Sequence, residues 1–132
     1  MSYKSEKPRK DSVRFFEERI KNHDMVTKVD KIEENYYCLT LADSRMYKVF
    51  VTNIYTVGVA DVMEIMSDYE VDGIVTMSIW NSYSLDAKMY ARKLGVGIFL
   101  LRELMGALNF EKPELYYSYI DDDGREHFEG CK

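Results

Sequence analysis

The hydrophobic positions of this chain follow two different periods, and each period predicts a different kind of element. Near the start they recur every three or four residues, at Val13, Phe16 and Ile20, as on the buried face of an amphipathic helix. Asp11 and Ser12 come just before this stripe, and either side chain can accept a hydrogen bond from a free N–H group of a first helical turn. The pattern therefore predicts a helix that begins at Asp11 or Ser12.

Between residues 25 and 52 the pattern becomes strand-like. The first segment alternates loosely, the second is rich in strand-forming residues, and the polar turn 42–44 joins the second to the third. Such a turn between two strand-forming segments predicts a hairpin. Cys38 lies within the second segment and is expected to be buried as a small hydrophobic residue. The predicted strands are Met25–Ile32, Tyr36–Leu41 and Arg45–Thr52.

Helical spacing returns after residue 58, and an apolar segment follows it. The expected inner face of the helix consists of Val59, Val62, Met63, Met66 and Tyr69. The next segment, Gly73–Ile79, is largely apolar and carries no charge, which is typical of a strand buried on both faces. We expect this strand in the interior of a sheet, beside the strand at 45–52.

Ser84 is a plausible N-cap for a further helix that runs through Leu94 and stops at Gly95. A short strand at 96–100 and a helix at 101–108 come next. The inner stripe expected for the helix after Ser84 is Leu85, Met89, Tyr90 and Leu94.

The chain ends in a hairpin at about 115–130, with its turn at Asp123-Gly124. A helix, three meandering strands, and then helices alternating with strands indicate the α/β class. The predicted fold is a mixed central sheet with helices on both faces. Its length of 132 residues predicts one domain.

The charge of the chain is distributed unevenly. The net charge is −5, with +3 on residues 1–23 and −8 on residues 24–132. An acidic domain repels a phosphate backbone unless its basic residues cluster. We expect residues 1–10 to form a flexible basic arm with no apolar face to bury, and residues 11–132 to form the single α/β domain.

The composition argues against several classes of protein. Hydrophobic residues make up 46% and aromatic residues 14%, which is unlike a disordered chain. The N-terminus has no apolar run of the kind found in a signal peptide, and no apolar stretch approaches the ~20 residues that cross a bilayer. The cysteines, Cys38 and Cys131, form no metal-ligand spacing. We expect a protein of the reducing cytoplasm, without a membrane partner.

Five segments of the chain match one known pattern. The strand Val75-Thr76-Met77-Ser78 is followed by a helix that opens Ser84-Leu85-Asp86-Ala87 and closes Lys93-Leu94-Gly95. The helix Leu101–Leu108 and the leading Phe15-Phe16-Glu17-Glu18 complete the pattern. Together these segments resemble the restriction-endonuclease-like superfamily, and within it the Mrr-type restriction enzymes. The resemblance implies a nuclease-like fold and, in active members, Mg²⁺-dependent cleavage of DNA.

The residues that would perform this cleavage are absent from their expected positions. The resemblance implies an acid on the second strand and an acid-x-lysine triplet on the third. Two carboxylates would hold Mg²⁺ and the lysine would orient a water. Here the triplet aligns with Phe50-Val51-Thr52, and Tyr36–Leu41 contains no carboxylate. A relocated site would have to use Glu17, Glu18, Asp43 and Lys48, and Mg²⁺ is the cofactor expected only in that case.

The strongest candidate for a binding site is the loop after the apolar strand, because mixed α/β sheets often place ligands there. Trp80 and Tyr83 could stack on bases or anchor a protein partner, and Asn81 lies between them. The basic candidates for contacts with nucleic acid are Lys48, Lys88 and Arg92. We expect no metal site among these residues.

Three functions remain open on the sequence. The first is a non-catalytic binding or interaction module, with nucleic acid or a protein as partner, in DNA processing, defence or a mobile element. The second is a divergent Mg²⁺-dependent endonuclease with a relocated site. The third is a purely structural homodimer or assembly protein that uses the acidic, Tyr-rich C-terminal hairpin as an added strand edge. A nuclease should gather its basic residues beside carboxylates, whereas an assembly protein should expose an apolar patch.

Overall fold

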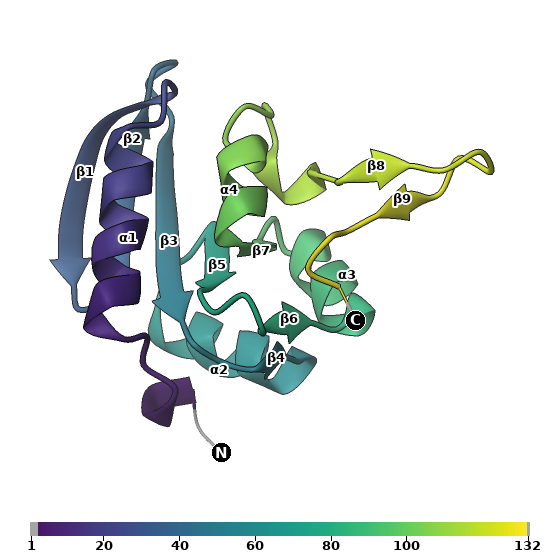
Figure 1. The fold of residues 1–132 in the computed structure, drawn as a ribbon, viewed down its shortest axis with the longest axis horizontal. Helices are drawn as coiled ribbons and strands as arrows, with labels where there is room; N and C mark the ends of the chain where they lie inside the picture. Colours follow the sequence, from purple (N-terminus) through teal and green to yellow (C-terminus); the bar gives the residue numbers. More distant parts are fainter. Residues whose placement is uncertain (1–2, 132) are drawn as a thin grey trace.

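A five-stranded mixed sheet forms the centre of the molecule (Figure 1). It is described by a computed structural model that covers residues 3–131. The strands lie side by side in the order β1-β2-β3-β5-β7. Their bounds are Val26–Glu33 for β1, Tyr36–Leu41 for β2, Met46–Thr52 for β3, Gly73–Thr76 for β5 and Gly97–Leu100 for β7. The predicted mixed α/β class is confirmed.

The sheet changes from antiparallel to parallel at β3. β1, β2 and β3 form an antiparallel meander, whereas β3, β5 and β7 run parallel to one another. β5 therefore has hydrogen-bonded neighbours on both sides, and the prediction of an interior strand beside β3 is confirmed. The strand is shorter than predicted, however. It ends at Thr76, and residues 77–79 belong to the loop that follows.

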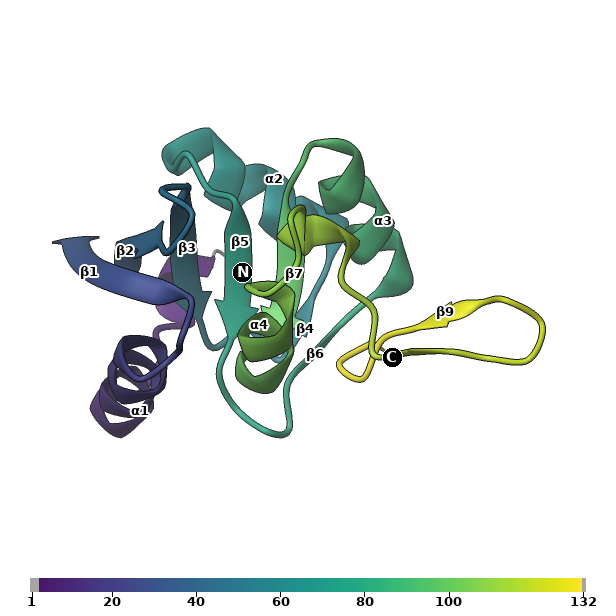
Figure 2. The ribbon, with the colours of Figure 1, turned by 90° about the horizontal axis from the view of Figure 1, so that it is seen from above.

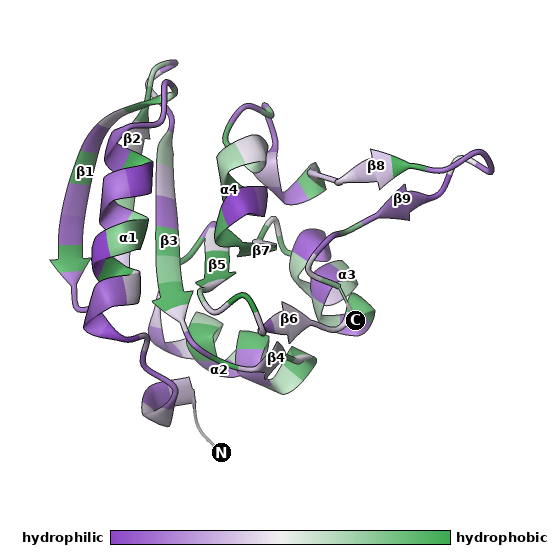
Figure 3. Cartoon of the chain, viewed as in Figure 1, coloured by the Kyte–Doolittle hydropathy of each residue, from purple (hydrophilic) through white to green (hydrophobic). Residues whose placement is uncertain are grey.

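Two pairs of helices cover the two faces of the sheet, as Figure 2 shows. α1 (Lys10–Lys21) and α4 (Leu101–Ala107) pack on one face through Phe16, Ile20 and Leu104. α2 (Val59–Asp68) and α3 (Leu85–Lys93) pack on the other. The strands supply hydrophobic residues to both cores, and Figure 3 shows the hydrophobic colour gathered along β3, β5 and β7.

Short elements complete the described chain. Two parallel bridging strands, β4 (Thr56–Val57) and β6 (Ser82–Tyr83), pair beside the main sheet. The C-terminal hairpin consists of β8 (Tyr119–Ile120) and β9 (Glu126–His127). Two 3-10 turns, Tyr3–Ser5 and Pro113–Leu115, precede α1 and follow α4. Of the helices within residues 3–131, none has the length and hydrophobicity to cross a membrane.

Two helices differ from their predicted form. α1 begins at Lys10 and has no side-chain cap, so neither Asp11 nor Ser12 acts as its N-cap. In α3, by contrast, the predicted cap is present, because the Ser84 hydroxyl accepts a hydrogen bond from the N–H group of Ala87. The predicted inner stripe of α3 is wrong at Leu85 and at residue 94, which are both about half exposed.

α3 instead turns Ala87, Lys88 and Ala91 inward. Since two of these side chains are small, the helix can lie close to its neighbours. The predicted inner face of α2 is correct for Val62 but wrong for Met63, whose side chain is more than half exposed.

The N-terminal segment packs against the domain. Tyr3 is buried, and its ring meets Phe50 of β3 edge-on with centroids 5.4 Å apart. The carbonyl oxygen of Glu6 accepts hydrogen bonds from the N–H group of Asn53 at 2.8 Å and the hydroxyl of Thr52 at 3.2 Å. The expectation that residues 1–10 have nothing apolar to bury is therefore wrong at Tyr3. Residues 1–2 lie outside the described part of this segment.

Candidate functional site

The loop between β5 and β6 is held from beneath by the side chain of Asn81. Its amide nitrogen lies 2.9 Å from the hydroxyl of Thr76 and 2.9 Å from the side-chain oxygen of Asn53. The Thr76 hydroxyl in turn donates to the carbonyl oxygen of Ile54 at 2.7 Å. Asn81 is buried, so the prediction that it lies on a binding surface is wrong. Its amide bonds occupy the base of the loop.

The same anchoring turns two large hydrophobic side chains outward. Ile79 is 75% exposed and Trp80 is 72% exposed. Ser78 braces the turn, because its hydroxyl accepts from the N–H group of Trp80 at 3.2 Å and its carbonyl from that of Asn81 at 2.9 Å. The loop thus presents Ile79 and Trp80 to solvent on a fixed backbone. The exposed position that the sequence predicted for Trp80 is therefore confirmed.

A cavity of about 270 Å³ lies beside this loop, between α1 and the start of α4. Met77 and Ile79 of the loop line it together with Phe15, which is 52% exposed. We define the apolar loop surface as Phe15, Met77, Ile79 and Met105, which line the cavity, together with the exposed Trp80, which follows Ile79 in the loop. With several large side chains in one place, it is the type of patch that marks an interaction site.

Two arginines flank the apolar loop surface. Arg19 and Arg102 both line the cavity, whose lining contains no carboxylate. The guanidinium carbon of Arg19 lies 5.8 Å from the ring centre of Phe15, and Arg102 forms an ion pair with Glu129. The cavity therefore combines hydrophobic walls with the positive charge of Arg19 at its edge, whereas Glu129 neutralises the charge of Arg102.

Tyr83 does not contribute to any exposed surface, although the sequence suggested it. It is fully buried in β6, its hydroxyl donates to Glu103 at 2.7 Å, and its N–H group donates to the carbonyl of Gly130 at 3.0 Å. Burial, followed by the neighbouring Glu103 carboxylate, raises the pKa of Tyr83. The pairing of β6 with β4 draws this part of the chain inward.

Lys88 is buried as well, and its prediction as a phosphate-binding residue is wrong. Its ammonium group donates to the carbonyl oxygen of Ile98 at 2.8 Å and lies 4.5 Å from the ring centre of Phe99. The rings of Tyr83 and Phe128 are each 5.2 Å away. Burial lowers the pKa of Lys88 to about 8, and the Glu103 carboxylate partly opposes this effect.

Arg92 and Lys48 do not join Lys88 in a basic patch. Arg92 donates to Glu126 at 2.9 Å and to the carbonyl oxygen of Glu114 at 3.1 Å, so the C-terminal segment occupies it. Lys48 donates to Glu70 at 3.2 Å, and this bond raises the pKa of Lys48. The basic residues proposed for contacts with nucleic acid thus have separate structural partners.

The four residues that a relocated nuclease site would have to use, Glu17, Glu18, Asp43 and Lys48, do not lie together. Glu17 accepts a hydrogen bond from Tyr37 at 2.7 Å on the face that α1 covers, whereas Lys48 alternates with core residues of that face and so points to the other. Asp43 is paired with Arg45 in the turn between β2 and β3, and Glu18 is exposed on α1. Within residues 3–131, no three His, Cys, Asp or Glu side chains are placed to hold a metal ion.

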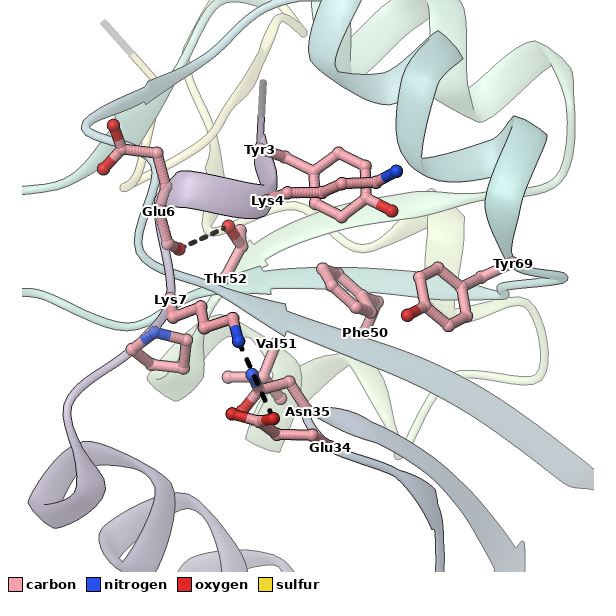
Figure 4. A pocket seen from close by; sticks show the side chains of 11 residues that line it. Tyr3, Lys4, Glu6, Lys7, Glu34, Asn35, Phe50, Val51, Thr52 and Tyr69 are labelled. Atoms are coloured by element: carbon pink, nitrogen blue, oxygen red, sulfur yellow. Dashed lines mark hydrogen bonds and ion pairs between the residues drawn. The ribbon is translucent and has the colours of Figure 1, made fainter. Parts of the chain in front are cut away.

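A second cavity, of about 320 Å³, lies at the carboxyl end of β3, where the nuclease triplet would align. Figure 4 shows the rings of Tyr3, Phe50 and Tyr69 on one side of it, and the side chains of Lys7 and Glu34 on the other. Phe50 stacks on Tyr69 at 4.8 Å, and Tyr3 closes over Phe50. Burial, together with the hydrogen bond to Asp68, raises the pKa of Tyr3. At the position where the sequence resemblance implied carboxylates, Phe50 instead makes hydrophobic contacts with the N-terminal segment.

Most residues of the apolar loop surface were not predicted from the sequence. Phe15 precedes Phe16 in α1, and neighbours in a helix point about 100° apart. Because Phe16 is buried, Phe15 had to face elsewhere, and this signal could have been read. Ile79 gave no such signal, since it ends an apolar run.

Comparisons with known proteins found no family model, no curated protein and no solved structure that matches the chain.

Proposed function

We propose that this chain is a non-catalytic binding module of nuclease-like fold that docks a protein partner on its apolar loop surface. The observation that carries the proposal is the outward position of Ile79 and Trp80 beside a cavity. The bonds of Asn81 hold both in place. Exposing such residues is unfavourable unless something covers them. The resemblance to Mrr-type enzymes suggests DNA processing, defence or a mobile element as the setting.

The charges of the surface favour a protein over nucleic acid. Only Arg19 and Arg102 carry charge in the cavity lining, and residues 24–132 carry a net charge of −8. Affinity for a phosphate backbone rests on many cationic contacts. A hydrophobic patch with Arg19 at its edge, and with Arg102 already paired with Glu129, suits a peptide segment that is mainly apolar and carries a carboxylate.

A photo-crosslinking residue in place of Ile79 tests the proposal. The same residue in place of Met63, which is exposed on α2 on the other face of the sheet, is the matched control. We expect a protein adduct from position 79 alone in cells that make the protein at native levels. The partner, once identified and purified, should bind with at least tenfold lower affinity to the Ile79→Asp variant. Equal adducts at both positions, or an adduct with nucleic acid, would contradict the proposal.

A further inference from the structure

The C-terminal hairpin projects from the body of the molecule, as Figures 1 and 2 show. Its strands have only two residues each, and a two-stranded hairpin by itself is marginally stable in water. Tyr119 is 58% exposed and Ile120 is 50% exposed. The end of β8 is accordingly a hydrophobic point in an otherwise hydrophilic arm (Figure 3).

The arm is nevertheless preformed by internal contacts. The ring of Tyr119 stacks on that of His127 with centroids 4.5 Å apart, and His127 lies 2.7 Å from a carboxylate oxygen of Asp121. The N–H group of Asp121 donates to the carbonyl oxygen of Arg125 at 2.9 Å. A preorganised arm loses less conformational entropy on binding than a flexible one. Because Tyr119 and Ile120 are consecutive in β8, their side chains point to opposite faces of the hairpin. Ile120 is therefore exposed on the face away from the Tyr119–His127 stack.

We propose that this hairpin docks on the apolar loop surface of a second copy of the chain, an inference that rests on the proposed function. Charge complementarity favours this occupant. Of the five acidic residues in 119–129, Asp121, Glu126 and Glu129 pair with His127, Arg92 and Arg102 of the same chain, and Asp122 and Asp123 lie at the turn. Of the two arginines in the cavity lining, Arg102 is paired with Glu129, whereas Arg19 faces no carboxylate in that lining. Each hairpin thus offers an apolar anchor, Ile120, close to two carboxylates, which is what the surface with Arg19 suits.

The position of the hairpin's root explains why two copies are needed. Glu129, just after β9, pairs with Arg102 at the edge of the cavity. The arm therefore starts next to the apolar loop surface of its own copy but points away from it (Figure 2). Two copies related by a two-fold axis can place each arm on the other's surface, which gives a closed dimer with two identical contacts.

Paired variants test this exchange by light scattering after size-exclusion chromatography. Wild type should be a dimer at micromolar concentration. Ile79→Asp in the surface and Ile120→Asp in the hairpin should each weaken dimerisation at least a hundredfold. An equimolar mixture of the two variants should form a heterodimer, because one of its two contacts is intact. Met63→Asp is the matched control and should remain a dimer. The far-UV circular dichroism spectra of all the variants should match wild type, which shows that each variant is folded.

Each contrary outcome has a separate meaning. A wild-type monomer, or variants that still dimerise as tightly as wild type, would overturn the exchange. A mixture that stays monomeric would do the same. If the wild type is a monomer while position 79 still crosslinks to a different protein, only the exchange fails and the proposed function stands. If position 79 gives no adduct with any protein, including this chain, the proposed function fails too.

Discussion

Replacing the buried Lys88 with methionine should make the protein more stable at neutral pH. The side chain is fully buried among Tyr83, Phe99 and Phe128, so its ammonium group has lost its hydration. A single carbonyl oxygen, that of Ile98, accepts its hydrogen bond. Methionine has a similar length and shape, fills the same space and carries no charge.

The magnitude follows from the pKa of Lys88, which burial lowers from 10.5 to about 8. A tenfold change in proton affinity corresponds to about 1.4 kcal/mol, so holding the charged lysine in the folded state costs about 3 kcal/mol at pH 7. Losing the hydrogen bond to Ile98 costs about 1 kcal/mol. The Lys88→Met variant should therefore be more stable than wild type by about 2 kcal/mol at pH 7.

The advantage should disappear as the pH rises. Between pH 8 and 10.5 the unfolded chain keeps the proton of Lys88 while the folded protein loses it, so wild-type stability increases with pH in this window. From pH 7 to pH 9.5 the gain of Lys88→Met over wild type should shrink by about 2 kcal/mol. Buried tyrosines with raised pKa values, such as Tyr83, have the opposite sign above pH 10. Their effect cancels in the difference between the two proteins.

Urea unfolding followed by circular dichroism, at pH values from 7 to 9.5, measures this difference. Lys93→Met, which removes an exposed lysine from the same helix, is the control and should follow the wild-type curve. If the difference in free energy of unfolding between Lys88→Met and wild type is the same at every pH from 7 to 9.5, this prediction is wrong. Lys88 would then not titrate between pH 7 and 9.5 with a lowered pKa.

Three further predictions concern the other regions described. Tyr3→Ala should lower the free energy of unfolding by about 3 kcal/mol in a urea titration, because it empties a buried aromatic site. Lys7→Ala, at an exposed ion pair, should change it by less than about 0.5 kcal/mol. Asn81→Ala should lower the midpoint of thermal unfolding, since buried partners lose their bonds, whereas Trp80→Ala should leave it unchanged. Purified protein should not cleave duplex or single-stranded DNA with Mg²⁺ or Mn²⁺, and cleavage that disappears in Lys48→Ala would overturn this view.

Local pattern was enough to predict the strands of the central sheet and the α-helices, although not the short strands β4 and β6. β2 has the bounds read from its run of strand-forming residues, and the Ser84 cap of α3 was predicted from its place before a helical stripe. Such features depend on backbone dihedral preferences and on hydrogen bonds between residues a few positions apart. They are therefore encoded in short stretches of sequence.

The exposure of individual side chains could not be predicted in this way, because a run of apolar residues has the same appearance in sequence whether it lies in a buried strand or in a loop. Ile79 belongs to the run that begins at Gly73, yet it is exposed, since Asn81 bonds to Asn53, 28 positions earlier in the chain. The sequence alone determined that β5 is an interior strand. It did not determine where the strand stops and the apolar loop surface begins.

Lys88 and Tyr3 are two further residues whose burial could not be predicted from the sequence. A lysine in a helix and a tyrosine in a polar N-terminal segment both read as surface residues, yet both are buried. The rings around Lys88 come from β6, β7 and the C-terminal segment, and the ring against Tyr3 comes from β3. The chain's local pattern decided its elements. Only tertiary contacts between distant segments decided which side chains meet water, because burial is a property of the surfaces that come together.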